Sequence, residues 1–259
     1  NACDAVTKLR RLASLGEYAE PENEKYRITV SVSKSKKTIT VSDNGIGMSE
    51  DELDRYICKM ALSGAMDFIR KYEGKDDSDS GIIGHFGLGF YSAFMVADKV
   101  DVLTKSYTDA PAVFWSCDEA GNYEISPAER TDRGTDVILH VNDDSDEYLS
   151  DYKLRGILDR YCAFMPVEIY LVDEDAAPAD GEDKKKEEKP VNDTMPLWQK
   201  KASECTEEEY LAFYRKVFDD YREPLFHLHL NADYPLNFKG ILYFPRLREG
   251  YESLEGKVK

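Results

Sequence analysis

The sequence contains no apolar run near the roughly 20 residues that a membrane-spanning helix needs, and no signal-peptide pattern opens it. Basic residues are scarce: 34 Lys and Arg stand against 51 Asp and Glu, for a formal net charge of −17. A field of that sign repels phosphate backbones and anionic lipid, which argues against binding nucleic acid or membranes through bulk charge. The five cysteines form no CxxC pair, which favours reduced thiols in a cytosolic protein over disulfides or zinc.

Both ends of the sequence resemble interior positions of a longer chain. It starts at Asn1, without Met, inside a helical pattern in which Ala2, Val6 and Leu9 share one face. No earlier residue is present to cap that helix, and residues 254–259 stop without a closing element. We therefore expect a fragment of a longer protein whose first helix is truncated.

Hydrophobic patterning predicts a domain of mixed helices and strands at the start of the chain. Alternating or continuous apolar residues predict strands at 26–32, 37–42, 99–106, 112–117, 134–141 and 167–172. Helical spacing and a capping-box pattern of Ser49 with Glu52 predict helices at the chain start and at 50–60, 91–97 and 152–165. The Gly-, Asp- and Ser-rich stretch 74–81 is expected to be a loop.

The composition changes after this region. Residues 173–190 mix both charges without apolar periodicity, which predicts a solvated linker. Beyond it, Thr206 with Glu209 predicts the start of a helix that runs to about Tyr221, and strands are expected at 226–230 and 240–244. The predicted organisation is a domain over 1–172, a charged linker over 173–190 and the beginning of a second domain over 191–259.

Two segments place polar groups beside structured elements. The opening helix carries Asn1, Asp4 and Lys8 on the side opposite its apolar face. In residues 41–48 a strand runs into Asp43 and two glycines. A carboxylate there can accept a hydrogen bond from an exocyclic amine, while bare glycine backbone admits a flat ring. Taken alone, the helix residues are more often solvated or capping groups than functional ones, and an ordinary Asn-Gly turn explains residues 41–48 as well as a binding site does.

A third segment, 81–92, holds four glycines within nine residues, followed by an apolar stretch. Backbone N–H groups of such a loop can converge on phosphate at a helix N-terminus, although a purely structural turn stays possible. It is not a dinucleotide fingerprint, because the order strand, GxGxxG, helix and later acid does not occur here, and it is not a P-loop, because no Gly-Lys-Ser/Thr follows it. His227 and His229 share a strand face but have no third ligand nearby, so a metal site is not expected there.

Taken in order, these segments resemble one known family. Asn1-Ala-Cys-Asp4, Asp43-Asn-Gly-Ile-Gly-Met48, Gly84-His-Phe-Gly-Leu-Gly-Phe-Tyr-Ser92 and Arg133-Gly-Thr135 follow the motif order of the GHKL nucleotide-binding superfamily. The glycine motif is similar to that of its ninety-kilodalton heat-shock chaperones, in their bacterial form, and residues 192–198 and 207–214 resemble the start of their middle domain. The resemblance implies an α+β fold, a two-layer sandwich with a mostly antiparallel sheet and helices on one face.

The resemblance implies a role for particular residues around an adenine nucleotide. Asp43 would accept a hydrogen bond from the adenine amine, and Thr135 would support the same edge through its hydroxyl. Gly47 and Met48 would line the adenine pocket, and Asp4 and Lys8 would flank the ribose and adenine side. Asn1 would coordinate Mg²⁺ between the phosphates. Backbone contacts to the phosphates would come from Gly84, Phe86, Gly87, Leu88, Gly89 and Phe90.

Other functional residues of the family would lie outside this sequence. The general base, a glutamate, would precede Asn1, and an arginine that reaches the terminal phosphate would follow Lys259. No catalytic residue is therefore assigned within the chain. Residues 60–84 would form a lid over ATP, but Tyr56 and Leu62 stand where commoner members carry Asn and Lys, so those two contacts are not transferred.

The resemblance implies the ATP-binding region of a stress-response chaperone that binds ATP or ADP with Mg²⁺. Binding and hydrolysis would drive lid closure and the folding of unfolded client proteins by a cytoplasmic homodimer, with no nucleic-acid or membrane partner. Two alternatives stay open on the residues alone. Another GHKL kinase or topoisomerase would call for a phospho-acceptor His segment or a basic DNA-facing surface, and a protein-interaction module would show no saturable nucleotide binding.

Overall fold

The computed structural model describes residues 1–58, 82–84, 89–176, 189–218, 220–232 and 238–246. The chain forms two compact units that divide between Asn192 and Asp193. In chain order the first unit contains α1 (Ala2–Ser14), β1 (Arg27–Ser33), β2 (Thr38–Asp43), α2 (Glu50–Tyr56), the 3₁₀ helix η1 (Gly89–Met95), β3 (Ala97–Lys105), β4 (Val113–Asp118), β5 (Tyr123–Pro127), β6 (Gly134–Val141), the 3₁₀ helix η2 (Asp143–Tyr148), α4 (Asp151–Tyr161) and β7 (Glu168–Asp173).

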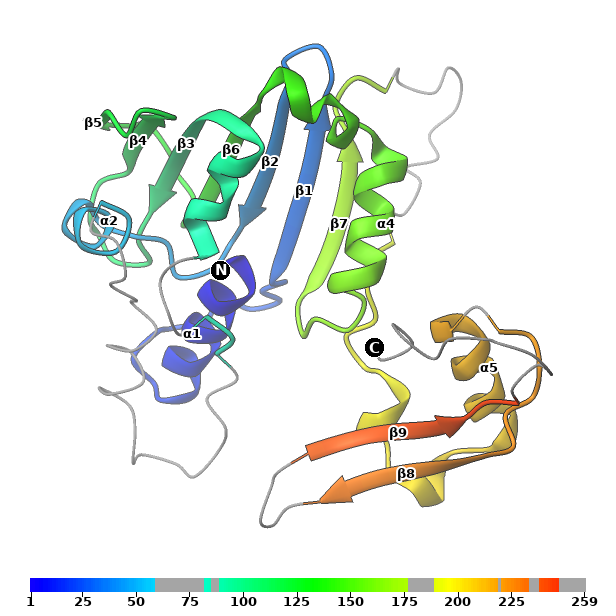
Figure 1. The fold of residues 1–259 in the computed structure, drawn as a ribbon. Coiled ribbons are helices and arrows are strands. Elements are labelled where there is room, and N and C mark those ends of the chain that lie inside the picture. Colours follow the sequence, from blue (N-terminus) through cyan, green and yellow to red (C-terminus); the bar gives the residue numbers. More distant parts are fainter. Residues whose placement is uncertain (59–81, 85–88, 177–188, 219, 233–237, 247–259) are drawn as a thin grey trace, which may run out of the picture. The chain divides into compact units, whose positions relative to one another are not determined.

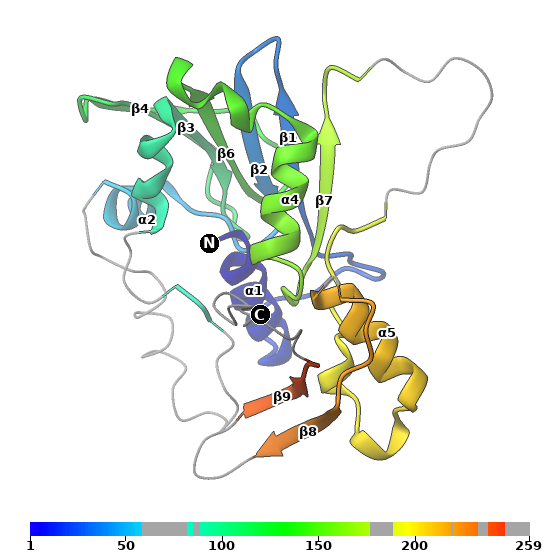
Figure 2. The same ribbon diagram turned by 45° about the vertical axis from the view of Figure 1, so that its right-hand side comes forward.

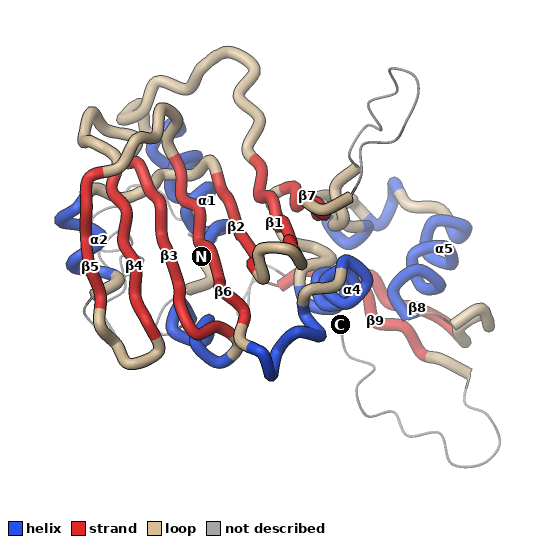
Figure 3. Tube along the Cα trace, turned by 90° about the horizontal axis from the view of Figure 1, so that it is seen from above, coloured by secondary structure: helices blue, strands red, loops and turns tan. Residues whose placement is uncertain are grey.

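The first unit is built on a seven-stranded sheet with the order β5-β4-β3-β6-β2-β1-β7 (Figures 1 and 3). Every pair of neighbours is antiparallel except β1 and β7, which are parallel. The predicted α+β class with a mostly antiparallel sheet is therefore confirmed. The predicted hairpin is confirmed as β1 and β2, whose register pairs Val30 with Val41 and Val32 with Ile39.

Helices pack against one face of this sheet (Figures 1 and 2). In one buried cluster, Val6 and Leu9 of α1 and Leu154 of α4 meet Val30 and Val32 of β1. A second cluster joins α2 and η1 to the inward residues of β3 and β4; its buried members include Leu53, Val100, Val102 and Trp115. Each large side chain buried in this way contributes about 1.5–3 kcal/mol to folding. The helix face of the sheet is thus the core.

Local sequence signals explain where α2 begins. Ser49 N donates to Glu52 Oε2 at 2.8 Å, and Glu52 N donates to Ser49 Oγ at 3.4 Å, which confirms the predicted capping box. The helix ends at Tyr56, short of the predicted 60, and residues 59–81 lie outside the described ranges, with most of the predicted loop and lid.

Two sequence predictions in the first unit need correction. The helix predicted at 91–97 is a 3₁₀ helix, Gly89–Met95, because Ala97 already starts β3 and Phe90 and Phe94 are drawn onto the second buried cluster. Strand β5 was not predicted, because most of its residues are exposed and it lacks an apolar alternation. The remaining predicted strands correspond to β3, β4, β6 and β7, and the helix predicted at 152–165 is α4.

The first unit extends past the predicted boundary between 190 and 191. The Asn192 side chain accepts a hydrogen bond from Ile169 N at 2.7 Å and donates to Met165 O and Val167 O at 2.9 and 2.8 Å. Val191 N also donates to Ile169 O at 2.7 Å. These bonds attach residues 191–192 to the start of β7, so they belong with the sheet.

The second unit contains the 3₁₀ helices η3 (Leu197–Gln199) and η4 (Ala202–Glu204), α5 (Glu207–Phe218), and an antiparallel pair of strands, β8 (Phe226–Ala232) and β9 (Phe238–Phe244). Thr206 and Glu209 form the predicted cap: Thr206 N donates to Glu209 Oε2 at 2.8 Å. No described helix is long and apolar enough to cross a membrane. All five cysteines lie in described ranges, and none forms a disulfide.

Candidate functional site

A buried carboxyl group marks the centre of the candidate site. Asp43 ends β2 and pairs in register with Thr135 of β6 on one side and Ile28 of β1 on the other. Its side chain is 7% exposed, and Oδ1 accepts a hydrogen bond from Gly45 N at 2.8 Å. Within the described residues, Oδ2 has no hydrogen-bond partner. Burial raises the pKa of Asp43 to about 7, although the Gly45 N–H and the Arg130 charge oppose the rise.

Two glycines let the backbone close in around Asp43. Gly47 has φ +62°, and a Cβ there would lie 1.8 Å from Lys105 O. Gly134 has φ +120°, and a Cβ there would lie 2.1 Å from Asp43 O. Both positions therefore require glycine for conformation and for space. Backbone atoms of Lys105 and Asp43 lie where side chains at these two positions would be, so the chain packs closely around the strand end that carries Asp43.

A pair of buried hydroxyls lies next to this surface. Thr135, one of the predicted site residues, has its Oγ1 2.9 Å from Thr104 Oγ1. Thr104 Oγ1 also accepts a hydrogen bond from the backbone N–H of the predicted residue Met48 at 3.0 Å. Thr104 was not predicted. Its signal in the sequence is a hydroxyl on the inward face of β3, in the same alternation as Val100 and Val102.

The first turn of α1 is held against the same loop. Ile46 N donates to Ala5 O at 3.1 Å, and a Cβ at Gly45 would lie 2.6 Å from the Ala5 carbonyl carbon. This close approach brings the predicted residues of the helix to the loop that follows Asp43. Asn1 is the N-cap of α1, and its side chain makes no cap hydrogen bond.

The predicted polar residues of α1 are in contact with the start of the glycine-rich segment. Asp4 accepts hydrogen bonds from Ile83 N at 2.8 Å and from Gly84 N at 2.7 Å. A Cβ at Gly84 would lie 2.9 Å from Asp4 Oδ2 and 3.7 Å from Asn1 Oδ1. Burial lowers the pKa of Lys8, against the attraction of nearby carboxylates. The structure thus brings Asn1, Asp4 and Gly84 together.

Only part of the predicted phosphate-binding segment is described. Phe86, Gly87 and Leu88 lie outside the described residues, together with Leu62. Gly89 opens η1, and the ring of Phe90 packs edge-on against Trp115 with a centroid distance of 5.6 Å. The Phe90 side chain therefore belongs to the core, and only its backbone stays available as a ligand contact.

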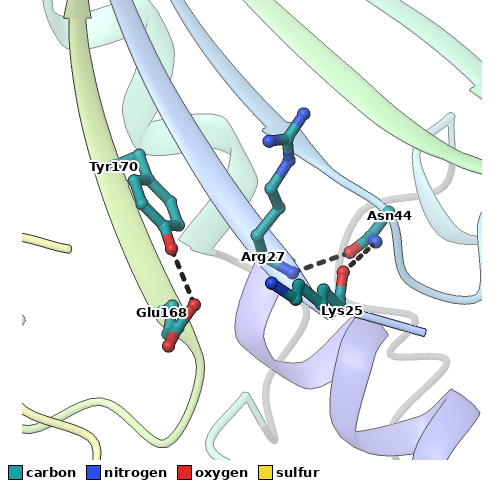
Figure 4. A pocket seen from close by; sticks show the side chains of 5 residues that line it. All are labelled: Lys25, Arg27, Asn44, Glu168 and Tyr170. Atoms are coloured by element: carbon teal, nitrogen blue, oxygen red, sulfur yellow. Dashed lines mark hydrogen bonds between the residues drawn. The ribbon is translucent and has the colours of Figure 1, made fainter. Parts of the chain in front are cut away.

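An open pocket of about 450 Å³ lies apart from this site (Figure 4). Successive side chains of a strand point to opposite faces of the sheet. Asp43 lies on the same face of β2 as Ile39 and Val41, which is the core face. Arg27 of β1 and Glu168 of β7 each stand next to a core residue of their strand and therefore point to the other face of the sheet. Asn44 is the link: its Oδ1 accepts from Arg27 N at 2.9 Å and its Nδ2 donates to Lys25 O at 2.8 Å. Asn44 thereby attaches the turn to β1.

The histidines of the second unit have structural partners. Tyr210 Oη lies 2.7 Å from His229 Nδ1, and the Tyr210 ring stacks on His227 with centroids 3.9 Å apart. Among the described residues, no group of three His, Cys, Asp or Glu side chains could hold a metal ion.

Comparison with known proteins gives two family matches. Residues 2–143 match the family described as histidine kinase-, DNA gyrase B-, and HSP90-like ATPase, and residues 179–257 match the family described as Hsp90 protein. The first match runs from α1 through β6. It therefore includes every described residue that surrounds Asp43.

Individual relatives are similar over nearly the entire chain. It is 45% identical over 260 residues to the chaperone protein HtpG of Porphyromonas gingivalis and to that of Bacteroides fragilis, with 100% of this chain and 37% of each relative covered. It is 38% identical over 254 residues to HtpG of Idiomarina loihiensis, with 95% of this chain and 40% of the relative covered. The chain thus spans well under half the length of these relatives. Because the first match covers more than half of the chain and residues 179–257 match Hsp90 protein, the chain belongs to the family of histidine kinase-, DNA gyrase B-, and HSP90-like ATPases.

Proposed function

We propose that this chain is the ATP-binding region of an ATP-dependent molecular chaperone. The observation that carries the proposal is the Asp43 carboxyl group, which is buried, bonded through one oxygen, and without a described partner on the other. As a carboxylate oxygen, Asp43 Oδ2 can accept a hydrogen bond from a donor of a bound ligand. The exocyclic amine of adenine supplies such a donor. Similarity to the HtpG chaperones supports the same assignment.

At the adenine end, Asp43 Oδ2 accepts the amine hydrogen bond and the Thr135 hydroxyl contacts the same edge of the ring. Thr104 holds that hydroxyl through the 2.9 Å contact between their Oγ1 atoms. The backbone at Gly47 can lie against Lys105 because residue 47 carries no side chain, and Met48 is proposed to line the adenine pocket beside it. The site therefore selects adenine by one acceptor and by shape.

At the phosphate end, Asn1 would hold Mg²⁺ through its amide oxygen. The residues fit this ion, because Asn1 Oδ1 is a hard oxygen ligand at the N-cap of α1 and its side chain makes no cap hydrogen bond. Bound Mg²⁺ neutralises phosphate charge. Phe86, Gly87, Leu88, Gly89 and Phe90 are proposed to contribute backbone contacts to the phosphates.

The chaperone activity belongs to the whole protein. We propose that ATP binding and hydrolysis there drive the folding of client proteins by a cytoplasmic homodimer. The proposed general base precedes Asn1 and the proposed arginine follows Lys259, so this chain is expected to bind nucleotide and hydrolyse it weakly. Losing a general base typically reduces a rate about 10²–10⁴-fold.

Calorimetric titration with ATP and ADP, with and without Mg²⁺, tests the proposal. We expect saturable one-site binding that Asp43→Asn abolishes, because the amide presents an N–H₂ group toward the amine. The matched control is Asp144→Asn, an exposed acid on η2, which should leave affinity unchanged. Unchanged ATP affinity in folded Asp43→Asn protein would refute the adenine assignment, and absence of binding in folded wild-type protein would refute nucleotide binding by this chain.

A further inference from the structure

Asp4 is an acid of a helix first turn that is buried where such residues are usually solvated. Its side chain is 5% exposed, and it does not cap its own helix. Its two oxygens are both engaged by backbone N–H groups far away in sequence: Oδ1 by Ile83 at 2.8 Å and Oδ2 by Gly84 at 2.7 Å. Two short bonds to a carboxylate are stronger than bonds between neutral groups.

The helix that carries Asp4 is held in place by the core. On the apolar face of α1, Val6 and Leu9 are fully buried and Leu12 is 1% exposed. The Ala5 carbonyl next to Asp4 is tied to Ile46 N. Asp4 therefore extends from a rigid helix, and its carboxylate holds two residues that lie about 80 positions later in the chain.

The other side of the contact is equally close-fitting. Ile82, one residue earlier, is buried, whereas Ile83 is exposed, so the segment is held by its backbone and by one side chain. A Cβ at Gly84 would lie 2.9 Å from Asp4 Oδ2 and would have to push the carboxylate away. Glycine at position 84 is therefore explained by the approach of Asp4.

We propose that Asp4 is a positioning residue that anchors Ile83 and Gly84 through both carboxylate oxygens, so that the glycine-rich segment starts beside Asn1. This inference rests on the proposed nucleotide binding and revises two expectations. Asp4 holds protein backbone and does not flank the ribose, and the Gly84 N–H is committed to Asp4 and not to phosphate.

Two variants test the anchor from opposite sides. Asp4→Asn keeps the size of the side chain but places an N–H₂ group against one backbone N–H, and Gly84→Ala keeps the charge of Asp4 but crowds Oδ2. In both, affinity for Mg·ADP should fall about tenfold or more, while affinity for adenosine stays within about twofold of wild type. The control, Asp51→Asn in the first turn of α2, should change neither.

Hydrogen exchange at residues 82–84 without nucleotide gives a second readout. The Ile83 and Gly84 amides should exchange slowly in wild-type protein and about tenfold or more faster in Asp4→Asn. Equal losses of adenosine and ADP affinity would overturn the inference, because they would indicate a nucleoside contact or general destabilisation. Unchanged exchange would overturn it as well. If wild-type protein bound neither ligand, the proposed function would fail, while the exchange experiment would still decide whether Asp4 anchors the backbone.

Discussion

Asp43 places an ionisable carboxyl group where its surroundings favour the neutral form. Its position before two glycines could be predicted from the sequence, because the strand and the turn are both local patterns. The place of Thr104 beside Thr135 could not be predicted, since register between β3 and β6 depends on which strands pair. Motif residues were therefore predictable one at a time, whereas the hydroxyl that supports them was found only from the structure.

The raised pKa predicts how the stability of the ligand-free protein depends on pH. The folded pKa of about 7 exceeds the ordinary 3.8, so the folded state binds the proton more tightly than the unfolded chain. The free energy of unfolding should therefore fall as pH rises from about 4 to about 7, by an amount on the order of 4 kcal/mol. Urea denaturation should show Asp43→Asn more stable than wild type at about pH 8, with a smaller difference at about pH 5. An equal difference at both pH values would contradict this.

Gly47 permits a second prediction about a single residue, with a natural control. Gly47 and Gly121 both have positive φ, but a Cβ would meet Lys105 O at 1.8 Å at Gly47 and nothing within 4 Å at Gly121. Gly121→Ala should therefore destabilise by only about 1 kcal/mol. Gly47→Ala should destabilise by about 2 kcal/mol more, because backbone must move. Chemical denaturation of both variants measures the difference in unfolding free energy. Similar losses of stability would contradict the prediction, because they would show that the backbone around residue 47 moves at little cost.

At the scale of helices and strands, the sequence predicted an element correctly where its local pattern matched the residues that the structure buries. The hairpin of β1 and β2 and the start of α2 follow from alternation and from a capping box. The 3₁₀ form of η1 depends instead on distant partners: Phe90 packs on Trp115, and Tyr91 Oη donates to Ile57 O at 2.7 Å. The parallel pairing of β1 with β7 could not be predicted either, because hydrophobic periodicity indicates a strand but not which strand lies next to it.

The capping box of α2 should make a measurable contribution to stability. Leu53, in the middle of this helix, is fully buried, so loosening the helix start also loosens part of the second core cluster. Ser49→Ala should lower the free energy of unfolding by about 1 kcal/mol. Ser49→Thr keeps a hydroxyl and should therefore retain most of the stability of the wild-type protein. If both variants lost the same amount of stability, the effect would come from packing at this position and not from helix capping.

At the scale of the whole molecule, the boundary between the units is defined by hydrogen bonds. Asn192 forms hydrogen bonds with the Ile169 N–H of β7 and with the carbonyls of Met165 and Val167, which lie just before this strand. The change in composition at residue 173 could be predicted from the sequence. The sequence does not show that residues 191–192 return to β7 before the chain leaves the first unit. The compact unit consequently ends about 20 residues beyond the point where its apolar pattern stops.

Truncation tests this boundary. A fragment of residues 1–192 should fold and bind Mg·ADP within about twofold of the complete chain, because every described residue of the site belongs to the first unit. A fragment of residues 1–172 leaves three backbone groups of residues 165–169 without Asn192 and should be less stable by about 1–3 kcal/mol or more. Thermal unfolding compares the two, and equal melting temperatures would contradict the assignment of residues 191–192 to the sheet.

The return of the chain to β7 bears on how the charged segment 177–188 can vary. Before it, Asp175 accepts hydrogen bonds from Ser35 N at 2.9 Å and from Ser35 Oγ at 2.6 Å; after it, Val191 and Asn192 are bonded to β7. Both ends are thus fastened to the same sheet. Doubling the length of such a closed segment adds only about 0.6 kcal/mol of closure entropy. Insertions and deletions can therefore accumulate there over evolution, and a peptide tag or reporter can be engineered there, without moving the residues at either end.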